Sequence, residues 1–434
     1  MFSYYFQLAL RSFRRNKVLT ALMVVAIALG IGASMTTLTV FYILSGDPLP
    51  GKSHKLFFPQ MDPRNMDGYV ASEEPEEQFT RYDAETLLRE KKGDRQALMT
   101  GGGFSIEPDK QGLSPFVVDA RYTSTDFFPM FEVPFAHGNG WSAADDDGRA
   151  RVVVIAKELN DKLFDGGNSV GKTIRIEQNE FRVVGVLKEW RPTPRFYDLN
   201  MDRYGEVEQA FVPFSTAVEL KMGRNGSMNC WGENTSGDEI GLNAPCTWMQ
   251  YWVQLDTPEK VSAYRQYLSN YSDQQRRAGR FERPTNTRLR NVMEWLDHKK
   301  VVPNDVRLQT WLAFGFLLVC LINTVGLLLA KFMRRSSEIG VRRALGASKR
   351  AIFAQALVEA GTVGLAGGVL GLILALLGLW AVRQQPASYA ELAHLDPVML
   401  LTTFILAIVA SVLAGLLPAW RACQVTPAIQ LKSQ

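Results

Sequence analysis

Residues 331–360 read KFMRRSSEIGVRRALGASKRAIFAQALVEA and separate two long apolar runs. Between Lys331 and Arg350 this stretch carries seven Lys or Arg residues and one acid, Glu338. Loops rich in Lys and Arg stay on the cytoplasmic side of a membrane, because these residues near the ends of spans resist translocation. The stretch therefore predicts a cytoplasmic loop between two membrane spans, and the rest of the chain is arranged around it.

A short amphipathic helix is expected inside this loop, from Ser337 to Leu345. The residues expected on its apolar side are Ile339, Val341, Ala344 and Leu345. Gly346 then breaks the helix before a new one begins near Ser348. A loop that only fixed topology would need charge but no such helix, so we expect this helix to dock on a partner.

Four apolar runs approach or exceed the roughly 20 residues needed to cross a hydrocarbon core. The predicted spans are residues 18–44, 307–330, 361–382 and 398–417. The first is uncharged over 27 residues, longer than the roughly 7–15 apolar residues of a signal peptide, so we expect a retained anchor. The sequence thus predicts an α-helical membrane protein with four transmembrane helices.

Charge orients these spans. Residues 1–17 contain four cations and no acid, so both termini and the basic loop are expected in the cytoplasm and residues 45–306 outside. Residues 45–306 hold 33 basic and 40 acidic residues, whereas the remainder holds 15 and 4. The net charge of +4 therefore comes from membrane anchoring. It indicates contact with membrane lipids and no nucleic-acid binding.

Strand-like and helix-like stretches alternate in residues 45–306, which predicts a large α+β domain inserted between the first two spans. The expected elements are a strand at Val152–Ile155, a helix at Lys157–Phe164, a hairpin turn about Gln178–Glu180 and a helix at Thr257–Arg277. The predicted segments are an interfacial helix (1–17), the first span (18–44), the outer domain (45–306, with an inserted lobe at about 140–245), the second span (307–330), the cytoplasmic loop (331–360), the third span (361–382), a short outer loop (383–397), the fourth span (398–417) and a cytoplasmic tail (418–434).

Residues with site chemistry are few. Cys230 and Cys246 fall in the outer domain, where they form either a disulfide or two free thiols. No His or Cys group has metal-ligand spacing, and no catalytic set of Ser, His, Asp or Cys is evident, so we predict no metal, no bound cofactor and no enzyme activity. In the third span, Gly364/Gly368 and Gly367/Gly371 have the spacing that lets helices approach closely, within one subunit or across a dimer.

One motif imitates a nucleotide site. Residues 166–173, GGNSVGKT, satisfy the P-loop pattern, which requires a strand before it and a helix after it. Here a predicted helix precedes the motif and a predicted strand follows it. We therefore expect a structural turn.

The basic loop also resembles a known family. EIGVRRALGASKRAI (338–352) is similar to the signature loop of the MacB/FtsX family of ABC-transporter permeases, and LLPAWRACQVTPAIQL (416–431) resembles the segment after the family's last span. PFVVDARYTSTDFFPMFEVPF (115–135) and VGKTIRI (170–176) resemble the family's periplasmic core. The resemblance covers both membrane blocks, the loop and much of the outer domain.

The resemblance implies an inner-membrane permease of a bacterium, here without a fused ATPase domain. Its loop would touch a cytoplasmic ABC ATPase through Glu338, Ile339, Val341, Arg342, Arg343, Leu345 and Gly346. The ATPase would use ATP and Mg, and a second copy or a homologous permease would complete a dimer. An adaptor and an outer-membrane channel are further family partners.

The resemblance implies two alternative functions. In one, ATP hydrolysis moves the periplasmic domains by mechanotransmission and drives efflux or extraction of a substrate. In the other, the chain is an FtsX-like regulator that activates a periplasmic enzyme. A membrane-anchored receptor or scaffold without an ATPase is disfavoured only by the signature loop.

Overall fold

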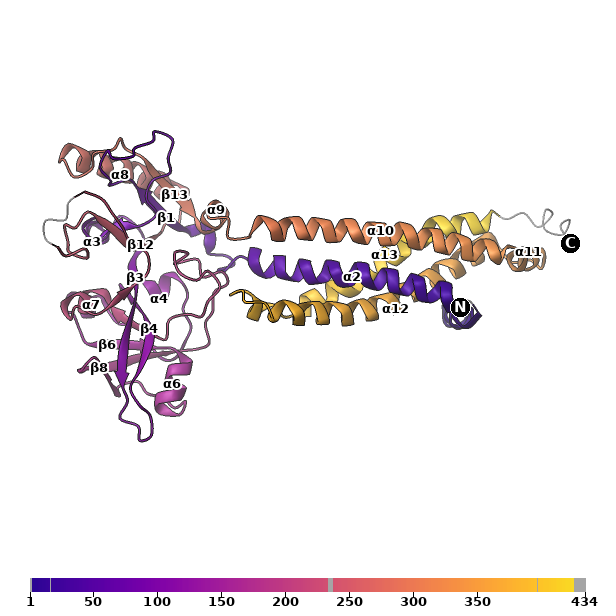
Figure 1. The fold of residues 1–434 in the computed structure, drawn as a ribbon, viewed down its shortest axis with the longest axis horizontal. Coiled ribbons are helices and arrows are strands. Elements are labelled where there is room, and N and C mark those ends of the chain that lie inside the picture. The colour runs from indigo at the N-terminus through magenta and orange to yellow at the C-terminus, as the bar shows by residue number, and fades with distance from the viewer. Residues whose placement is uncertain (1, 16, 233–236, 396, 425–434) are drawn as a thin grey trace. The chain divides into compact units, whose positions relative to one another are not determined.

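The computed structural model describes residues 2–15, 17–232, 237–395 and 397–424. The chain forms two compact units (Figure 1). One consists of Met1–Ser45 and Val302–Gln434, here called the membrane unit, and the other of Gly46–Val301, here called the outer unit.

The membrane unit is helical. Its elements are α1 (Phe2–Arg15), α2 (Lys17–Ser45), α10 (Asn304–Arg334), α11 (Ser336–Ala344), α12 (Lys349–Arg383), the 3-10 turn η2 (Ala390–Leu392) and α13 (Pro397–Cys423). Four of them, α2, α10, α12 and α13, are long and apolar enough to cross a membrane, in agreement with the four predicted transmembrane helices. Both α10 and α12 run past the predicted span limits, because helical hydrogen bonding continues through the flanking charged residues.

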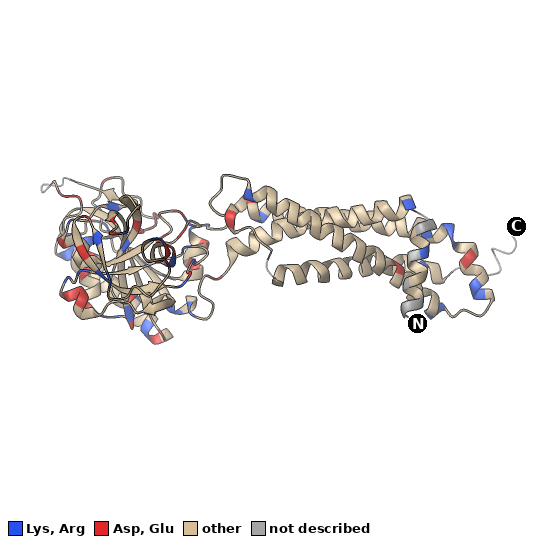
Figure 2. Cartoon of the chain, turned by 90° about the horizontal axis from the view of Figure 1, so that it is seen from below, with Lys and Arg blue, Asp and Glu red and all other residues tan. Residues whose placement is uncertain are grey.

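The long helices pack side by side (Figure 1): α2 lies against α10 and α12, and α12 lies against α13. Residues of α2 at four-residue intervals form a buried stripe, Met23, Ile27, Ile31 and Met35. The opposite face exposes Val18, Leu22, Val25 and Leu29. Figure 2 shows few charged residues along the middle of these helices. Such exposed apolar faces suit the hydrocarbon of a lipid bilayer.

The outer unit is built on a mixed sheet in the order β13-β1-β12-β3-β4-β9-β6-β8-β5. These strands are β1 (Leu56–Met61), β3 (Arg95–Glu107), β4 (Phe116–Thr123), β5 (Phe135–Gly138), β6 (Val152–Ile155), β8 (Asn179–Leu187), β9 (Ala210–Pro213), β12 (Cys246–Gln254) and β13 (Thr287–Asn291). Four more strands join the sides of this path: β2 (Phe79–Thr80), β7 (Thr173–Ile176), β10 (Arg224–Asn225) and β11 (Asn229–Cys230). The pairs β4/β9 and β6/β8 are parallel.

Helices and turns cover this sheet: η1 (Ser53–Lys55), α3 (Arg81–Glu90), α4 (Phe127–Met130), α5 (Ala143–Asp147), α6 (Lys157–Phe164), α7 (Phe214–Glu219), α8 (Pro258–Arg277) and α9 (Val292–His298). The outer unit is thus an α+β domain between the first two long helices, as predicted. Strands from residues 140–245 belong to the same sheet as strands outside that range, and the whole of Gly46–Val301 forms one compact unit.

Local sequence signals account for several of these elements. The predicted strand and helix at 152–164 are β6 and α6, and the helix predicted at 257–277 is α8. Thr257 caps α8 by accepting a hydrogen bond from the amide of Lys260. The hairpin β7–β8 turns at Glu177 and Gln178, which have φ angles of 45° and 67°. Two successive left-handed residues produce the tight turn whose twist matches the paired strands.

The aromatic stretch FFPMF forms α4, directly after β4. Phe127 and Phe131 are fully buried. The ring of Phe127 lies 5.5 Å from that of Tyr197, and the ring of Phe131 lies 6.0 Å from that of Trp252. Edge-to-face contacts of this kind stabilise a core beyond the apolar area they bury. The motif is therefore a packing anchor of the outer unit.

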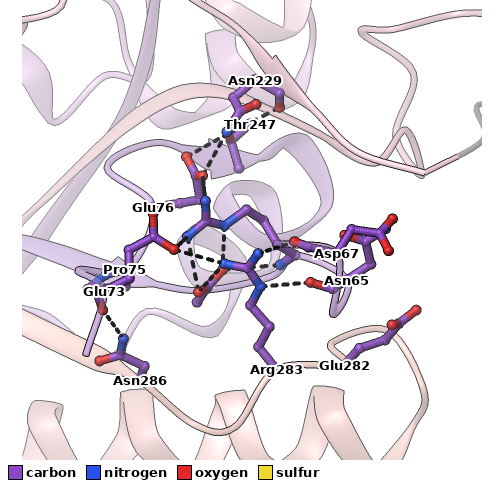
Figure 3. A network of polar contacts seen from close by, with 12 residues as sticks. Asn65, Asp67, Glu73, Pro75, Glu76, Asn229, Thr247, Glu282, Arg283 and Asn286 are labelled. Carbon is purple, nitrogen blue, oxygen red and sulfur yellow. Dashed lines mark hydrogen bonds and ion pairs between the residues drawn. The ribbon is translucent and has the colours of Figure 1, made fainter. Parts of the chain in front are cut away.

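A polar network ties the irregular segment 62–78 to the rest of the outer unit (Figure 3). The buried guanidinium of Arg283 donates to Asp62 at 3.1 Å and to the Asn65 carbonyl at 2.7 Å. Arg64 pairs with Glu76 at 3.1 Å, and Glu76 accepts a hydrogen bond from Asn229 at 2.7 Å. Burial raises the pKa of Glu76 above its ordinary value, although Arg64 opposes the shift.

This network reaches the strand pair β11–β12, where Cys230 faces Cys246 in register. The two cysteines are joined by a disulfide that closes a loop with a sequence separation of 16. Of the alternatives left open by the sequence, the structure therefore has the disulfide and not two free thiols.

Candidate functional site

The basic loop forms the helix α11, between the ends of α10 and α12. Gly346 terminates it with a φ of 97°. Its amide donates to the Arg343 carbonyl at 3.1 Å, and the next amide donates to the Arg342 carbonyl at 3.0 Å. These two bonds constitute a Schellman motif, in which the left-handed position favours glycine. Ser348 then caps α12 by accepting from the Ala351 amide. The end of α11 and the start of α12 are therefore both determined by local sequence, at Gly346 and Ser348.

One face of α11 contacts the neighbouring helices of the membrane unit. Glu338 pairs with Arg342 at 2.8 Å and with Arg335 at 3.2 Å. Arg342 also donates to Gln355 of α12 at 3.0 Å. Ile339 packs against the apolar core of the long helices. This side of the helix is therefore held in place by contacts within the chain.

The opposite face is apolar and exposed. Val341 is 55% exposed and Leu345 is 83% exposed, and Ser337 and Ala344 are exposed beside them. Positions 337, 341, 344 and 345 lie on one side of a helix. The single apolar side expected from sequence is thus divided: Ile339 points inward, whereas Val341, Ala344 and Leu345 face outward. The reason is that α12 and the core occupy the side of α11 that carries Ile339.

A buried ionic cluster lies where α1, α10 and α12 meet. Glu359 of α12 accepts from Lys331 at 2.7 Å and from Ser12 at 2.5 Å. Arg335 donates to the second carboxylate oxygen of Glu359 at 3.4 Å and to Ser12 at 3.0 Å. Lys331 is fully buried and Glu359 is 3% exposed. Because Arg335 also pairs with Glu338, the cluster links α11 to α1, α10 and α12.

The end of α13 is joined to the same region. Arg343 donates to the carbonyl of Cys423 at 3.3 Å, and the Cys423 thiol donates to the Lys349 carbonyl at 3.4 Å. From α2, the hydroxyl of Thr20 lies 3.4 Å from the Lys331 ammonium. All the long helices of the membrane unit, together with α1, thus have polar contacts with α11, its flanking residues or the buried cluster.

Comparison with known proteins shows the family of this chain. The family model of the MacB-like periplasmic core domain matches residues 20–271, and the family model of the FtsX-like permease C-terminal domain matches residues 311–427. The chain belongs to the MacB/FtsX permease family. Proteins of this family are transporter permeases, a class that is not an enzyme in itself.

Curated relatives of this MacB/FtsX permease include a pyoverdine export ATP-binding/permease protein PvdT of Pseudomonas syringae, 28% identical over 71% of the chain and 42% of the relative. A macrolide export ATP-binding/permease protein MacB of Escherichia coli is 26% identical over the same shares. The chain spans about two fifths of the length of these relatives. A solved periplasmic region of MacB from Actinobacillus actinomycetemcomitans aligns with a TM-score of 0.36 at 14% identity, over 59% of the chain and 96% of that structure.

The glycines of the permease's third long helix pack against two different partners. A Cβ atom at Gly364 would lie 2.0 Å from the Ser411 hydroxyl of α13, and one at Gly368 would lie 2.7 Å from a side chain of the same helix. At Gly367 and Gly371 it would meet α2, at 2.7 and 3.0 Å. Both glycine pairs therefore serve close packing inside one chain.

The P-loop-like motif of the permease is a turn, as expected. It lies between α6 and β7, so no helix follows it. The amide of Gly171 donates to the Val183 carbonyl at 2.8 Å, within the fold. The described residues of the permease contain no group of three His, Cys, Asp or Glu side chains able to hold a metal ion.

From the sequence, α11 can be identified and Glu359 can be expected to cap or pair with the basic loop, but the full buried cluster beneath α11 was missed. Ser12, Lys331, Arg335 and Glu359 are distributed over 347 positions, so no motif joins them. One signal was present: Glu359 is the single acid between Glu338 and Glu391, beside a predicted span. An acid at such a position requires a cationic partner, and Lys331 was the nearest cation at the end of the preceding span.

Proposed function

We propose that this chain is the permease subunit of an ABC-type export assembly and that α11 is its docking helix for a separate cytoplasmic ATPase. The observation that carries the proposal is the exposed apolar face of Val341, Ala344 and Leu345 on a helix whose other face is bonded to the membrane unit. Val341 at 55% exposed and Leu345 at 83% exposed form, with Ala344, a contiguous exposed apolar face, and such faces mark sites of interaction with a partner.

The proposed topology rests on charge. The cations of α11 and its flanks support a topology in which this helix, the N-terminus and the C-terminus lie on the cytoplasmic side of a bacterial inner membrane. The outer unit then lies in the periplasm. It is joined covalently to two long helices of the membrane unit, since α2 ends at Ser45 and α10 begins at Asn304.

In this proposal the ATPase binds ATP and Mg, and its closure displaces α11. The displacement reaches α12 through the contacts Arg342–Gln355 and Arg335–Glu359. It reaches α10 through the chain, because α10 and α11 are separated only by the break at Arg335. Motion of α2 and α10 reaches the outer unit through the chain itself. The energy of hydrolysis is thus delivered as periplasmic motion, without a transport channel through one subunit.

Export is the output we propose, because the curated relatives PvdT and MacB are export proteins. A second permease copy or a homologous permease would complete the membrane assembly, with an adaptor and an outer-membrane channel as periplasmic partners. The alternative output, activation of a periplasmic enzyme, predicts instead that the outer unit captures a hydrolase.

The test is affinity purification in mild detergent of the wild type and of the double variant V341D/L345D. We expect an ABC ATPase to co-purify with the wild type and to be reduced at least about tenfold with the variant, since two apolar side chains that the ATPase would bury are each replaced by a charge. Val117→Asp is the matched control, because Val117 is 76% exposed but lies on β4 of the outer unit. Undiminished ATPase capture by V341D/L345D would refute the docking face.

A further inference from the structure

The outer unit contains a cleft that the proposed function does not use. It has a volume of about 760 Å³ and lies between α3 with the start of β3 on one side and α5 with α7 on the other. Small-molecule sites in proteins typically measure roughly 300–1,000 Å³. The cleft is therefore large enough to admit a small molecule or a short peptide.

The first wall of the cleft is cationic. It is lined by Arg89, Lys91 and Arg95, at the end of α3 and the start of β3. All three side chains are exposed, and none has an ion pair among the described residues. Two acids also line this wall, but Glu85 is paired with a fourth cation, Arg81, at 2.7 Å, and Asp94 is paired with Lys260. Arg95 donates a long hydrogen bond of 3.5 Å to Gln254, and the charges of Arg89, Lys91 and Arg95 remain without an ion pair among the described residues.

The opposite wall is anionic. Asp146 and Asp147 of α5 and Glu219 of α7 line it, together with one cation, Arg149. Asp147 and Glu219 are exposed and have no ion pair among the described residues. A ligand that carries a positive and a negative group at its two ends would be attracted to both walls, and in only one orientation. The separation of opposite charges on facing walls therefore indicates what kind of ligand the cleft would bind.

The anionic wall is held rigidly. The Asp146 carboxylate accepts from the Thr125 amide at 2.7 Å and from the Trp141 indole at 2.8 Å, so each oxygen has a fixed donor. The Ser215 hydroxyl donates to the Asp146 carbonyl at 2.6 Å and joins α7 to α5. Burial raises the pKa of Asp146 to about 6. A cationic ligand group beside this carboxylate would offset that burial.

The base of the cleft joins the two walls. The backbone amide of Gln96 donates to Asp126 at 3.0 Å, and the Gln96 side chain donates to the Leu87 carbonyl at 3.0 Å and accepts from the Gly93 amide at 2.8 Å. Apolar side chains also line the cleft, Leu88 and Leu98 from the side of α3 and β3, and Phe214 and Val218 from α7. The cleft is therefore preformed, with charged and apolar side chains on both of its sides.

We propose that this cleft binds a small amphoteric molecule, a short peptide or peptide-like compound with a cationic group at Asp146, Asp147 and Glu219 and an anionic group at Arg89, Lys91 and Arg95. The apolar surface contacts the part of the ligand between the two charged groups. This site is independent of ATPase docking, because every residue that forms it belongs to the outer unit.

The test uses the full-length protein in detergent and isothermal titration calorimetry, with alanine peptides of three to five residues as probes. Each length is used with free termini, with an acetylated N-terminus and with an amidated C-terminus. We expect one site per chain for a peptide with free termini, and weaker binding when either terminus is blocked. We also expect weaker binding at high salt, because the contacting charges are partly exposed.

Two charge-reversal variants complete the test, D147K/E219K and R89E/K91E. Each should weaken binding of the free-termini peptide by roughly tenfold, since two attractive contacts become repulsive. Asp109→Lys and Arg265→Glu are matched controls, because both side chains are exposed and neither lines the cleft. Absence of binding at all lengths, or binding that neither blocking a terminus nor reversing a wall changes, would overturn the proposal.

Discussion

Replacing Glu359 by Gln should destabilise the membrane unit substantially. The change removes the carboxylate charge that faces Lys331 at 2.7 Å, and Lys331 is fully buried. Arg335 keeps a second acidic partner, Glu338 at 3.2 Å, so the main loss falls on Lys331. Breaking a buried ion pair by removing one partner costs about 3–5 kcal/mol, because it leaves an uncompensated charge.

The corresponding assay is the melting temperature of the detergent-solubilised protein, followed by size-exclusion chromatography of a fluorescent fusion after heating. At about 2–4 °C per kcal/mol for a unit of 150–250 residues, the melting temperature of E359Q should fall by roughly 6–20 °C. Arg334→Gln is the control and should change little, because Arg334 is exposed and has no ion pair among the described residues.

A double variant isolates the cause. K331M/E359Q removes both charges and replaces the lysine stem with an apolar one of similar length, so it should recover most of the loss. If E359Q melts like the wild type, the cluster does not stabilise the unit. If K331M/E359Q is as unstable as E359Q, the loss does not come from an unpaired buried charge, and the reasoning is wrong.

Three further predictions concern packing, pH and the disulfide. Gly364→Val should lower the free energy of unfolding by about 2–3 kcal/mol, because the new side chain would overpack against the Ser411 hydroxyl of α13. Gly361→Ala should be neutral or stabilising, because a Cβ atom at Gly361 would have nothing within 4 Å. Thermal melts of the two variants distinguish these outcomes. Because the pKa of Asp146 is raised to about 6 when folded, the folded state binds a proton more tightly than the unfolded state, and stability rises as pH falls through 6. From pH 7 to 5 the wild type should therefore gain about 1 kcal/mol relative to Asp146→Asn, and a parallel pH dependence of the two would contradict this. Replacing Cys230 and Cys246 by Ser should lower the free energy of unfolding of the outer unit by about 3 kcal/mol, the chain-entropy value for such a loop, and denaturant titration measures it.

Elements set by local pattern could be predicted from the sequence. The four long helices are predicted by apolar length, and α6, α8 and the β7–β8 hairpin by periodicity, capping and turn residues. Helix α11 could also be predicted, because Gly346 and Ser348 mark its end and the next start. These features depend on residues close together in the chain.

Contacts set by tertiary packing could not be predicted. Ile339 and Val341 are equally apolar, and only the position of α12 and the core decides that the first packs inward and the second is exposed. The expected roles of Arg342 and Arg343 are refined in the same way, because Arg342 contacts Gln355 and Arg343 contacts the end of α13. The outer cleft depends on residues 81–98, 143–149 and 214–219, which no pattern in the sequence brings together.

The central claim, that the exposed face of α11 carries the ATPase, is tested most directly by site-specific photo-crosslinking in living cells. A photoreactive amino acid is placed at Leu345, which is 83% exposed, and at Ile339, which packs inward, as the matched control. The account predicts a crosslinked product from position 345 whose peptides belong to an ABC ATPase, and none from position 339. A product from position 345 that contains no ATPase, or an equal ATPase product from position 339, would contradict it.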